Sequence, residues 1–298
     1  GIYRENMLLE TIDRCKDFKT EDEKNKIMGE AYFLRALYYW DLVQLFETVP
    51  LTIKTEPQNL PRATVEEMYA QMGSDMIKAI ELMPSVKYDM TEPGRATRWA
   101  AEGYLSRIFL FYTGFYQKES MPLNDGKTLT KADMIAYLDD CIKNSGHDLV
   151  GDFRNLWAYS NSHTAKDWQW AIDNNLKWEG DSNKEVMYAY KYAKIGSNGT
   201  TQMYKNFFML WQGLPTRINI MKTFPYAGGW ALGSVCPQIW DEWKAAEPTD
   251  IRRQGSIIDL DAEAPAYRAE GFDSWEETMY RAKKFMPVSA YDDKGNLK

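Results

Sequence analysis

Tryptophans concentrate in the second half of the sequence, in a setting that suits sugar binding. Eight of the 11 tryptophans fall between Trp157 and Trp243, where Gly, Pro and Asn are frequent and helical periodicity fades. A flat indole can cover the CH-rich face of a sugar, while polar side chains beside it bond the hydroxyls. On this argument the candidate ligand-binding residues are Trp168, Trp170, Trp211, Arg217, Asn219, Tyr226 and Trp230.

Packing is the competing role for each of these rings. Most tryptophans in globular proteins are buried or partly buried, so for any single one packing is the commoner use. Trp40 and Trp99 fall in helical sequence and are expected in the core. Arg35 and Arg107 also fall in apolar helical sequence, and we expect them to pair with carboxylates or helix-end carbonyls rather than with a ligand.

Motifs for catalysis and metal binding are missing from the sequence. It contains no HExxH, GxxxxGK[ST], GxSxG or GxGxxG, and its two histidines, His147 and His163, are isolated from other metal-ligand types. Residues 259–263 alternate acids along an expected extended segment but lack the spacing of an EF-hand, so a solvated acidic loop is expected. We predict no catalytic residue, no metal site and no cofactor.

Charge and cysteine usage exclude several classes of protein. Lys and Arg total 36 against 43 Asp and Glu, a net charge of −7, which argues against a nucleic-acid partner. Three scattered cysteines, Cys15, Cys141 and Cys236, form neither a zinc motif nor a disulfide framework. Apolar runs are too short for a membrane span. The chain starts with neither Met nor a signal peptide, so we expect a fragment of a longer protein.

Helical periodicity dominates the first half. Apolar residues recur every three or four positions over residues 23–46, 64–83, 97–115 and 130–144, and Thr64 with Glu67 forms a capping box. The helix pairs have similar spacing, which indicates a tetratricopeptide-like helical-repeat scaffold. We therefore predict a mainly α fold with a helical scaffold over residues 1–150.

The second half has a different character. Residues 151–298 are predicted to be an irregular, loop-rich, ligand-binding part of the same body, with a few short strands. Within it we expect a buried strand or an extended segment at 185–190, turns at 197–200 and 227–229, and a short helix at 237–246.

Three segments resemble the SusD/RagB-like nutrient-binding lipoproteins. They are EAYFLRALYYWDLVQLF at 30–46 followed by VPL at 49–51, PRATVEEMY at 61–69, and the stretch 96–111 that begins ATRWAA and ends LSRIFLF. Weaker similarity lies at 147–156, 183–190 and 247–253. The segments keep the family's order and span most of the chain.

The resemblance implies a tetratricopeptide-like scaffold packed against a loop-rich region that holds the ligand. It also implies a lipid-anchored protein on the outer face of a Gram-negative outer membrane, although the signal and lipidated cysteine of the family are not in this chain. The implied partner is a SusC-like TonB-dependent transporter. The implied ligand is an oligosaccharide or polysaccharide, or a peptide in some members, bound without catalysis. Family motifs transfer no site residue, so the site prediction rests on the aromatic residues.

Two other functions remain open from the sequence. Carboxylates are plentiful, so the acid–base pair of a helical glycosidase or lyase is one alternative. The other is a helical-repeat adaptor that binds proteins or peptides, in which the aromatic residues would be mostly buried.

Overall fold

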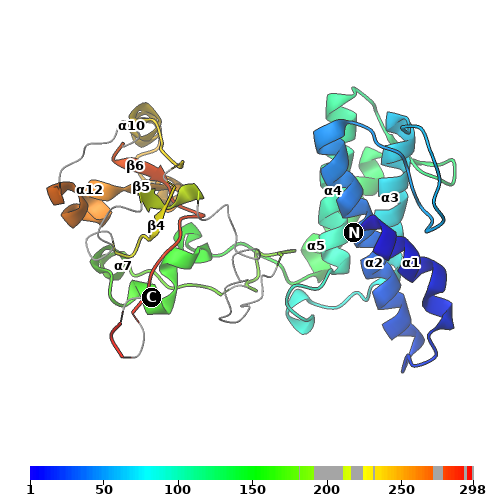
Figure 1. Ribbon diagram of the computed structural model, residues 1–298, viewed down its shortest axis with the longest axis horizontal. Coiled ribbons are helices and arrows are strands. Elements are labelled where there is room, and N and C mark those ends of the chain that lie inside the picture. The colour runs from blue at the N-terminus through cyan, green and yellow to red at the C-terminus, as the bar shows by residue number, and fades with distance from the viewer. Residues whose placement is uncertain are drawn as a thin grey trace. The chain divides into compact units, whose positions relative to one another are not determined.

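The computed structural model describes residues 1–180, 182–190, 211–215, 224–230, 232–270, 278–291 and 294–296. It divides into two compact units (Figure 1). The helical unit consists of Gly1–Leu149 and Lys184–Tyr190, and the loop-rich unit of Val150–Asn183 and Lys191–Lys298. Helices predominate and strands are few and short, so the predicted mainly α fold is confirmed.

Successive helices build the helical unit, each packed against the next along the chain (Figure 1). All four predicted helices are present, and a further one, α1, precedes them. The elements are α1 (Ile2–Thr11), η1 (Ile12–Arg14), α2 (Glu21–Phe46), α3 (Val65–Leu82), η2 (Tyr88–Met90), α4 (Arg98–Phe115), β1 (Met121–Pro122), β2 (Thr128–Leu129) and α5 (Lys131–Asn144). Strands β1 and β2 pair antiparallel.

Threonine begins each of the four main helices. The hydroxyls of Thr20, Thr64, Thr97 and Thr130 accept hydrogen bonds from backbone amides of the first turn. Thr64 and Thr130 complete capping boxes with the acid three residues later. An N-cap of this kind stabilises a helix by about 1 kcal/mol, so the four starts are specified locally.

A single hydrophobic core joins α2, α3 and α4, and Trp40 lies within it as predicted. Trp99 is also buried, and its Nε1 donates to the carbonyl of Val86 at 2.6 Å. Arg35 is buried and donates two hydrogen bonds, of 2.6 and 2.8 Å, to Asp75 of α3, which confirms its predicted structural role. Arg107 differs: it is exposed, and its guanidinium lies over the ring of Tyr104.

Residues 185–190 belong to the helical unit, not to the loop-rich unit, and they form no strand. Tyr188 packs edge-on against Phe33 and Tyr104, with ring centres 5.0 and 6.3 Å apart. Of the two predicted forms, the buried strand was therefore wrong, and the segment is half-buried without strand pairing. The apolar residues of this run are satisfied by packing on helices far away in the sequence.

Short helices and two small sheets make up the described part of the loop-rich unit. The helix predicted at 237–246 is confirmed as α10, whereas the turn predicted at 227–229 was wrong, because Gly228 and Gly229 form a strand. The turn predicted at 197–200 lies outside the described residues. The elements are η3 (Phe153–Leu156), η4 (Ala158–Ser160), α6 (Ser162–Ala165), α7 (Gln169–Asp173), β3 (Leu214–Pro215), β4 (Gly228–Gly229), α10 (Pro237–Ala246), α11 (Ile251–Ser256), β5 (Ile257–Asp259), α12 (Leu260–Glu263), η6 (Pro265–Glu270) and β6 (Tyr280–Ala282).

Strand pairing in the loop-rich unit joins segments far apart in sequence. β3 and β4 are parallel, and β5 and β6 are antiparallel. A separate hydrophobic core surrounds them, with Tyr159, Trp168 and Tyr226 among its members. None of the described helices of either unit is long and apolar enough to cross a membrane.

Candidate functional site

The predicted ligand-binding residues fall into three groups in the structure. Trp168, Trp170 and Tyr226 lie together in the core of the loop-rich unit. Trp211 and Trp230 lie at its surface. Arg217 and Asn219 lie outside the described residues. Because only an exposed ring offers a face to a large ligand, these groups differ in what they can bind.

Two members of the inner group are enclosed by protein. Trp168 is 3% exposed and Tyr226 is fully buried. Trp170 is half-buried and stacks on Trp168, with ring centres 4.9 Å apart. The Nε1 of Trp168 donates to the carbonyl of Glu263 at 3.1 Å, and the hydroxyl of Tyr226 donates to the carboxylate of Glu263. Neither Trp168 nor Tyr226 has a free face here, so both serve as core residues.

Glu263 and Lys283 form a buried ion pair at the centre of this group, which the sequence analysis missed. Their carboxylate oxygen and ammonium nitrogen are 2.7 Å apart, and both side chains are almost fully buried. Burial raises the pKa of Glu263 and lowers that of Lys283 to about 8. The ammonium also lies 3.9 Å from the ring centre of Trp170 and 4.5 Å from that of Tyr159, a cation–π arrangement.

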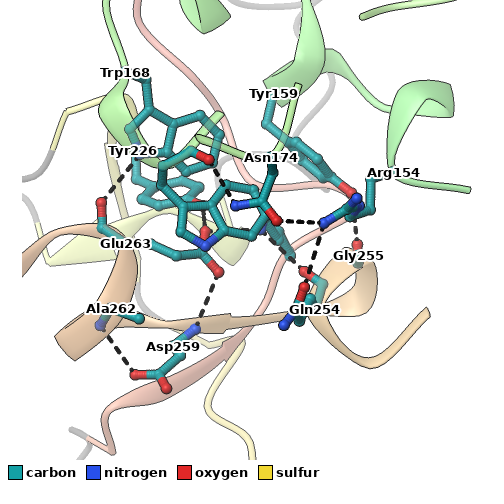
Figure 2. Close-up of polar contacts among 12 residues, drawn as sticks. Arg154, Tyr159, Trp168, Asn174, Tyr226, Gln254, Gly255, Asp259, Ala262 and Glu263 are labelled. Carbon is teal, nitrogen blue, oxygen red and sulfur yellow. Dashed lines mark hydrogen bonds and ion pairs between the residues drawn. The ribbon is translucent and has the colours of Figure 1, made fainter. Parts of the chain in front are cut away.

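The acidic run at 259–263 is therefore not the extended, solvated loop that we predicted. Asp259 ends β5 and caps α12, accepting from the amides of Asp261 and Ala262 (Figure 2). The helical turn carries Glu263 inward to Lys283, whereas Asp261 stays exposed. Among the described residues, no group of three or more His, Cys, Asp or Glu could hold a metal ion.

Polar side chains beside the inner tryptophans are also used internally. Arg154 pairs with Asp152 at 2.8 Å. It also donates to Asn174 at 2.7 Å (Figure 2). Asn174 in turn donates to the carbonyl of Trp170 at 2.8 Å. These groups, which could have bonded sugar hydroxyls, are instead part of the hydrogen-bond network that orders η3 and α7.

The outer group lies around the parallel pair β3–β4. Trp211 is 39% exposed, Trp230 is 54% exposed and Leu232 is 67% exposed. The amide of Leu232 donates to the carbonyl of Trp211 at 2.8 Å, so the backbone fixes these segments to each other. We call Trp211, Trp230 and Leu232 the exposed platform. Leu232 was not predicted, because an isolated leucine carries no signal of ligand contact.

Glycine allows the backbones of the platform to approach closely. A Cβ atom at Gly213 would lie 2.6–2.7 Å from backbone atoms of Gly228 and Gly229. Contacts that short do not occur between real side chains and backbone, so Gly213 cannot be replaced without moving β3 away from β4. Leu214, the next residue, is buried and anchors the strand to the core. The platform is thus held by a rigid base.

Residues 1–110 match the model of the SusD-like family, described as starch-binding and associating with the outer membrane. The SusD-like protein P25 of Formosa agariphila is 25% identical over 204 residues, which cover 67% of this chain and 33% of that protein. A SusD-like protein of Bacteroides ovatus is 26% identical over 153 residues, 48% of this chain and 26% of that protein. The matched segments span about a third or less of these relatives.

Solved structures share the fold at low identity. The surface glycan-binding protein A of Bacteroides fluxus aligns with a TM-score of 0.70 at 20% identity, over 97% of this chain and 53% of its own. The protein of the same name from Bacteroides thetaiotaomicron, solved with laminarihexaose, gives 0.69 at 17% identity, over 97% and 55%. A laminarin-binding SusD-like protein gives 0.64 at 20% identity, over 96% and 57%. This likeness establishes a common fold, over about half the length of those proteins.

Proposed function

Because the chain belongs to the SusD-like family, which its first 110 residues match and whose solved members share its fold, we propose that it binds oligosaccharides or polysaccharides without catalysis. The exposed platform of Trp211, Trp230 and Leu232 carries the proposal. Two indoles that remain at the surface can cover the CH faces of sugar rings. Arg217 and Asn219, which follow β3 in the sequence, stay in the proposal as hydroxyl-bonding partners.

The physical setting of the platform supports binding over packing. An exposed tryptophan leaves a large apolar area in water, which a bound ligand would cover. Backbone pairing and the close glycine contact hold both segments in place before a ligand arrives, so little ordering cost is added on binding. Many weak contacts along a polymer add avidity while each contact remains reversible, which suits a protein that passes its ligand on.

The names of solved relatives suggest which glycans to try first. One is a laminarin-binding protein, one was solved with laminarihexaose and one with a xylogluco-oligosaccharide. We propose a β-glucan as the first ligand class for this chain, on that similarity.

Location and partner follow from the family in the same way. The family is described as associating with the outer membrane. We propose that the protein works at the outer surface of that membrane as a lipid-anchored protein. There it would hand glycans to a SusC-like TonB-dependent transporter.

Alanine substitution of the platform tests the proposal. We expect Trp211→Ala and Trp230→Ala each to weaken binding of laminarihexaose or a xylogluco-oligosaccharide about tenfold, equivalent to ~1.4 kcal/mol, measured by isothermal titration calorimetry. Phe115→Ala is the control, because Phe115 is an exposed aromatic ring in the helical unit, outside the platform. Unchanged affinity in both tryptophan variants would refute the platform.

The same samples distinguish binding from catalysis. A binding protein leaves the glycan intact, so we expect no new reducing ends and no unsaturated ends after prolonged incubation. Their appearance in proportion to protein concentration would favour the glycosidase or lyase alternative instead.

A further inference from the structure

A cavity of about 500 Å³ opens in the helical unit among α3, α4, α5 and the β1–β2 hairpin. Its volume falls within the range of small-molecule sites. The apolar part of its wall consists of Ile77, Leu123, Leu129 and the ring of Tyr137. These residues come from three elements, so the cavity exists only in the folded unit, and no sequence motif marks it.

Charged side chains form the polar part of the wall, and their charges balance. Arg98 and Lys127 are cationic, while Asp133 and Asp140 are carboxylates. The four lining charges sum to zero, so the lining by itself does not select an anion. It offers both donors and acceptors, which matches a neutral ligand whose hydroxyl groups donate and accept.

Hydrogen bonds hold the Arg98 side of this wall in place. The Nη2 of Arg98 donates to Asp140 at 2.6 Å, and its Nε donates to Glu102 at 3.1 Å. Asn144 donates to the other oxygen of Asp140 at 2.6 Å. Glu102 lies fully buried behind them. These groups are ordered before a ligand arrives, which lowers the cost of binding.

Asp133 supplies an acceptor on the other side. Its Oδ2 accepts from the amide and hydroxyl of Thr130, which fixes the carboxylate at the start of α5. Its Oδ1 accepts no hydrogen bond from any residue that the structure describes. Lys127, on the hairpin, is largely exposed and pairs with Asp125 at 2.9 Å, which leaves part of its ammonium group open to a further acceptor.

We propose that this cavity is a second ligand site, which takes a neutral polyhydroxylated ring such as a monosaccharide or the end residue of a glycan. The CH face of the ring lies on Tyr137 and the neighbouring leucines. Its hydroxyls donate to Asp133 and accept from Lys127. The site uses none of the tryptophans of the exposed platform and does not depend on the function proposed for them.

Filling the cavity tests this site. Ala136 lines it from the exposed side of α5, so Ala136→Trp places an indole in it without disturbing the core. Ala132→Trp is the matched control, one turn earlier on α5, exposed and outside the cavity lining. Glucose, galactose and mannose at millimolar concentration are the probes. Saturation-transfer NMR measures their binding to protein that also carries Trp211→Ala and Trp230→Ala. This background removes the proposed platform.

We expect saturation transfer to at least one of these sugars on that background, retained with Ala132→Trp and lost with Ala136→Trp. Equal signals in the two α5 variants would overturn the proposal, as would no signal from any sugar. Putrescine is a cationic probe of the same experiment. Binding of putrescine in place of the sugars would overturn the assignment to a neutral ligand. The platform variants test glycan binding by Trp211 and Trp230, whereas the α5 variants test sugar binding in the cavity. Each proposal can therefore be refuted without the other.

Discussion

Lys283 lies in the interior of the loop-rich unit, where it pairs with Glu263 and faces the rings of Tyr159 and Trp170. A buried charge is costly unless another charge and hydrogen bonds compensate it. The carbonyl of Gln254 accepts a further hydrogen bond from Lys283 at 3.0 Å. At the scale of single residues, the inner tryptophans therefore enclose a cation of the protein itself rather than a sugar.

Removing this cation has a predictable cost. We expect Lys283→Met to lower the free energy of unfolding by ~3–5 kcal/mol, because Glu263 is left buried without its counter-charge. Urea denaturation measures the change. The double variant Lys283→Met/Glu263→Gln removes both charges and should recover part of the loss.

An exposed ion pair gives the control for this experiment. Lys78 and Glu81 are 2.6 Å apart but more than half exposed, so Lys78→Met should change stability by less than about 1 kcal/mol. If the Lys283 and Lys78 variants lost the same stability, burial would not be the cause.

At the scale of elements, α4 and α5 are joined through Arg98, which bonds Glu102 and Asp140. Burial raises the pKa of Glu102 to about 7, and it faces Asp140, whose pKa is held below its ordinary value by Asn144 and Arg98. The protonated carboxyl of Glu102 can donate a hydrogen bond to the carboxylate of Asp140. This explains why its buried Oε2 receives no hydrogen bond from the described residues.

Stability should depend on pH through Glu102. The pKa of Glu102 in the folded protein lies above the ordinary value of 4.5. Its contribution to the free energy of unfolding is therefore fully present below pH 4.5 and is lost as pH rises through 7. Glu102→Gln does not titrate but keeps a donor toward Asp140. We therefore expect it to reduce the fall in the free energy of unfolding between pH 5 and pH 8 by up to ~3 kcal/mol. Denaturation at pH 5 and pH 8 measures it.

Glu56→Gln is the control for the pH experiment, because Glu56 is an exposed glutamate of the same unit. It should follow the parent at both values of pH. The account is contradicted if Glu102→Gln shows the same difference in stability between pH 5 and pH 8 as the parent.

Sequence reasoning worked at this scale where local signals decide the structure. The starts of α3 and α5 could be predicted from Thr64 and Thr130 with their capping acids. It failed where distant contacts decide. Gly228 and Gly229 become a strand only because β3 passes beside them, and Tyr188 packs on Phe33 of a helix about 150 positions earlier. The inward position of Glu263 likewise depends on Lys283, which local pattern does not reveal.

At the scale of the whole molecule, two hydrophobic cores stabilise two units. The sequence could not predict which aromatic residues lie in the core and which at the surface. A tryptophan that packs and one that binds a ligand are flanked by the same kinds of residues in the sequence. Trp168 and Trp211 illustrate this, since both lie in irregular, polar sequence, yet one is enclosed and the other exposed.

Separate cores imply separable stability. We expect Lys283→Met to speed backbone hydrogen exchange in β5 and α12 while leaving α3 and α4 unchanged, as followed by mass spectrometry of peptides. The lysine bonds Glu263 and the carbonyl of Gln254 and faces aromatic rings, and all of these groups lie in the loop-rich unit. Equal acceleration in α3 and α4 would show that the two cores unfold as one.

The central claim is that Trp211 and Trp230 bind glycan while the enclosed tryptophans do not. Labelling with 5-fluorotryptophan gives each indole its own ¹⁹F resonance, assigned with Trp211→Phe, Trp230→Phe and Trp168→Phe. During titration with laminarihexaose or a xylogluco-oligosaccharide, we expect the Trp211 and Trp230 resonances to shift in a saturable way while that of Trp168 stays constant. Saturable shifts confined to other tryptophans, or none with either glycan, would contradict the account.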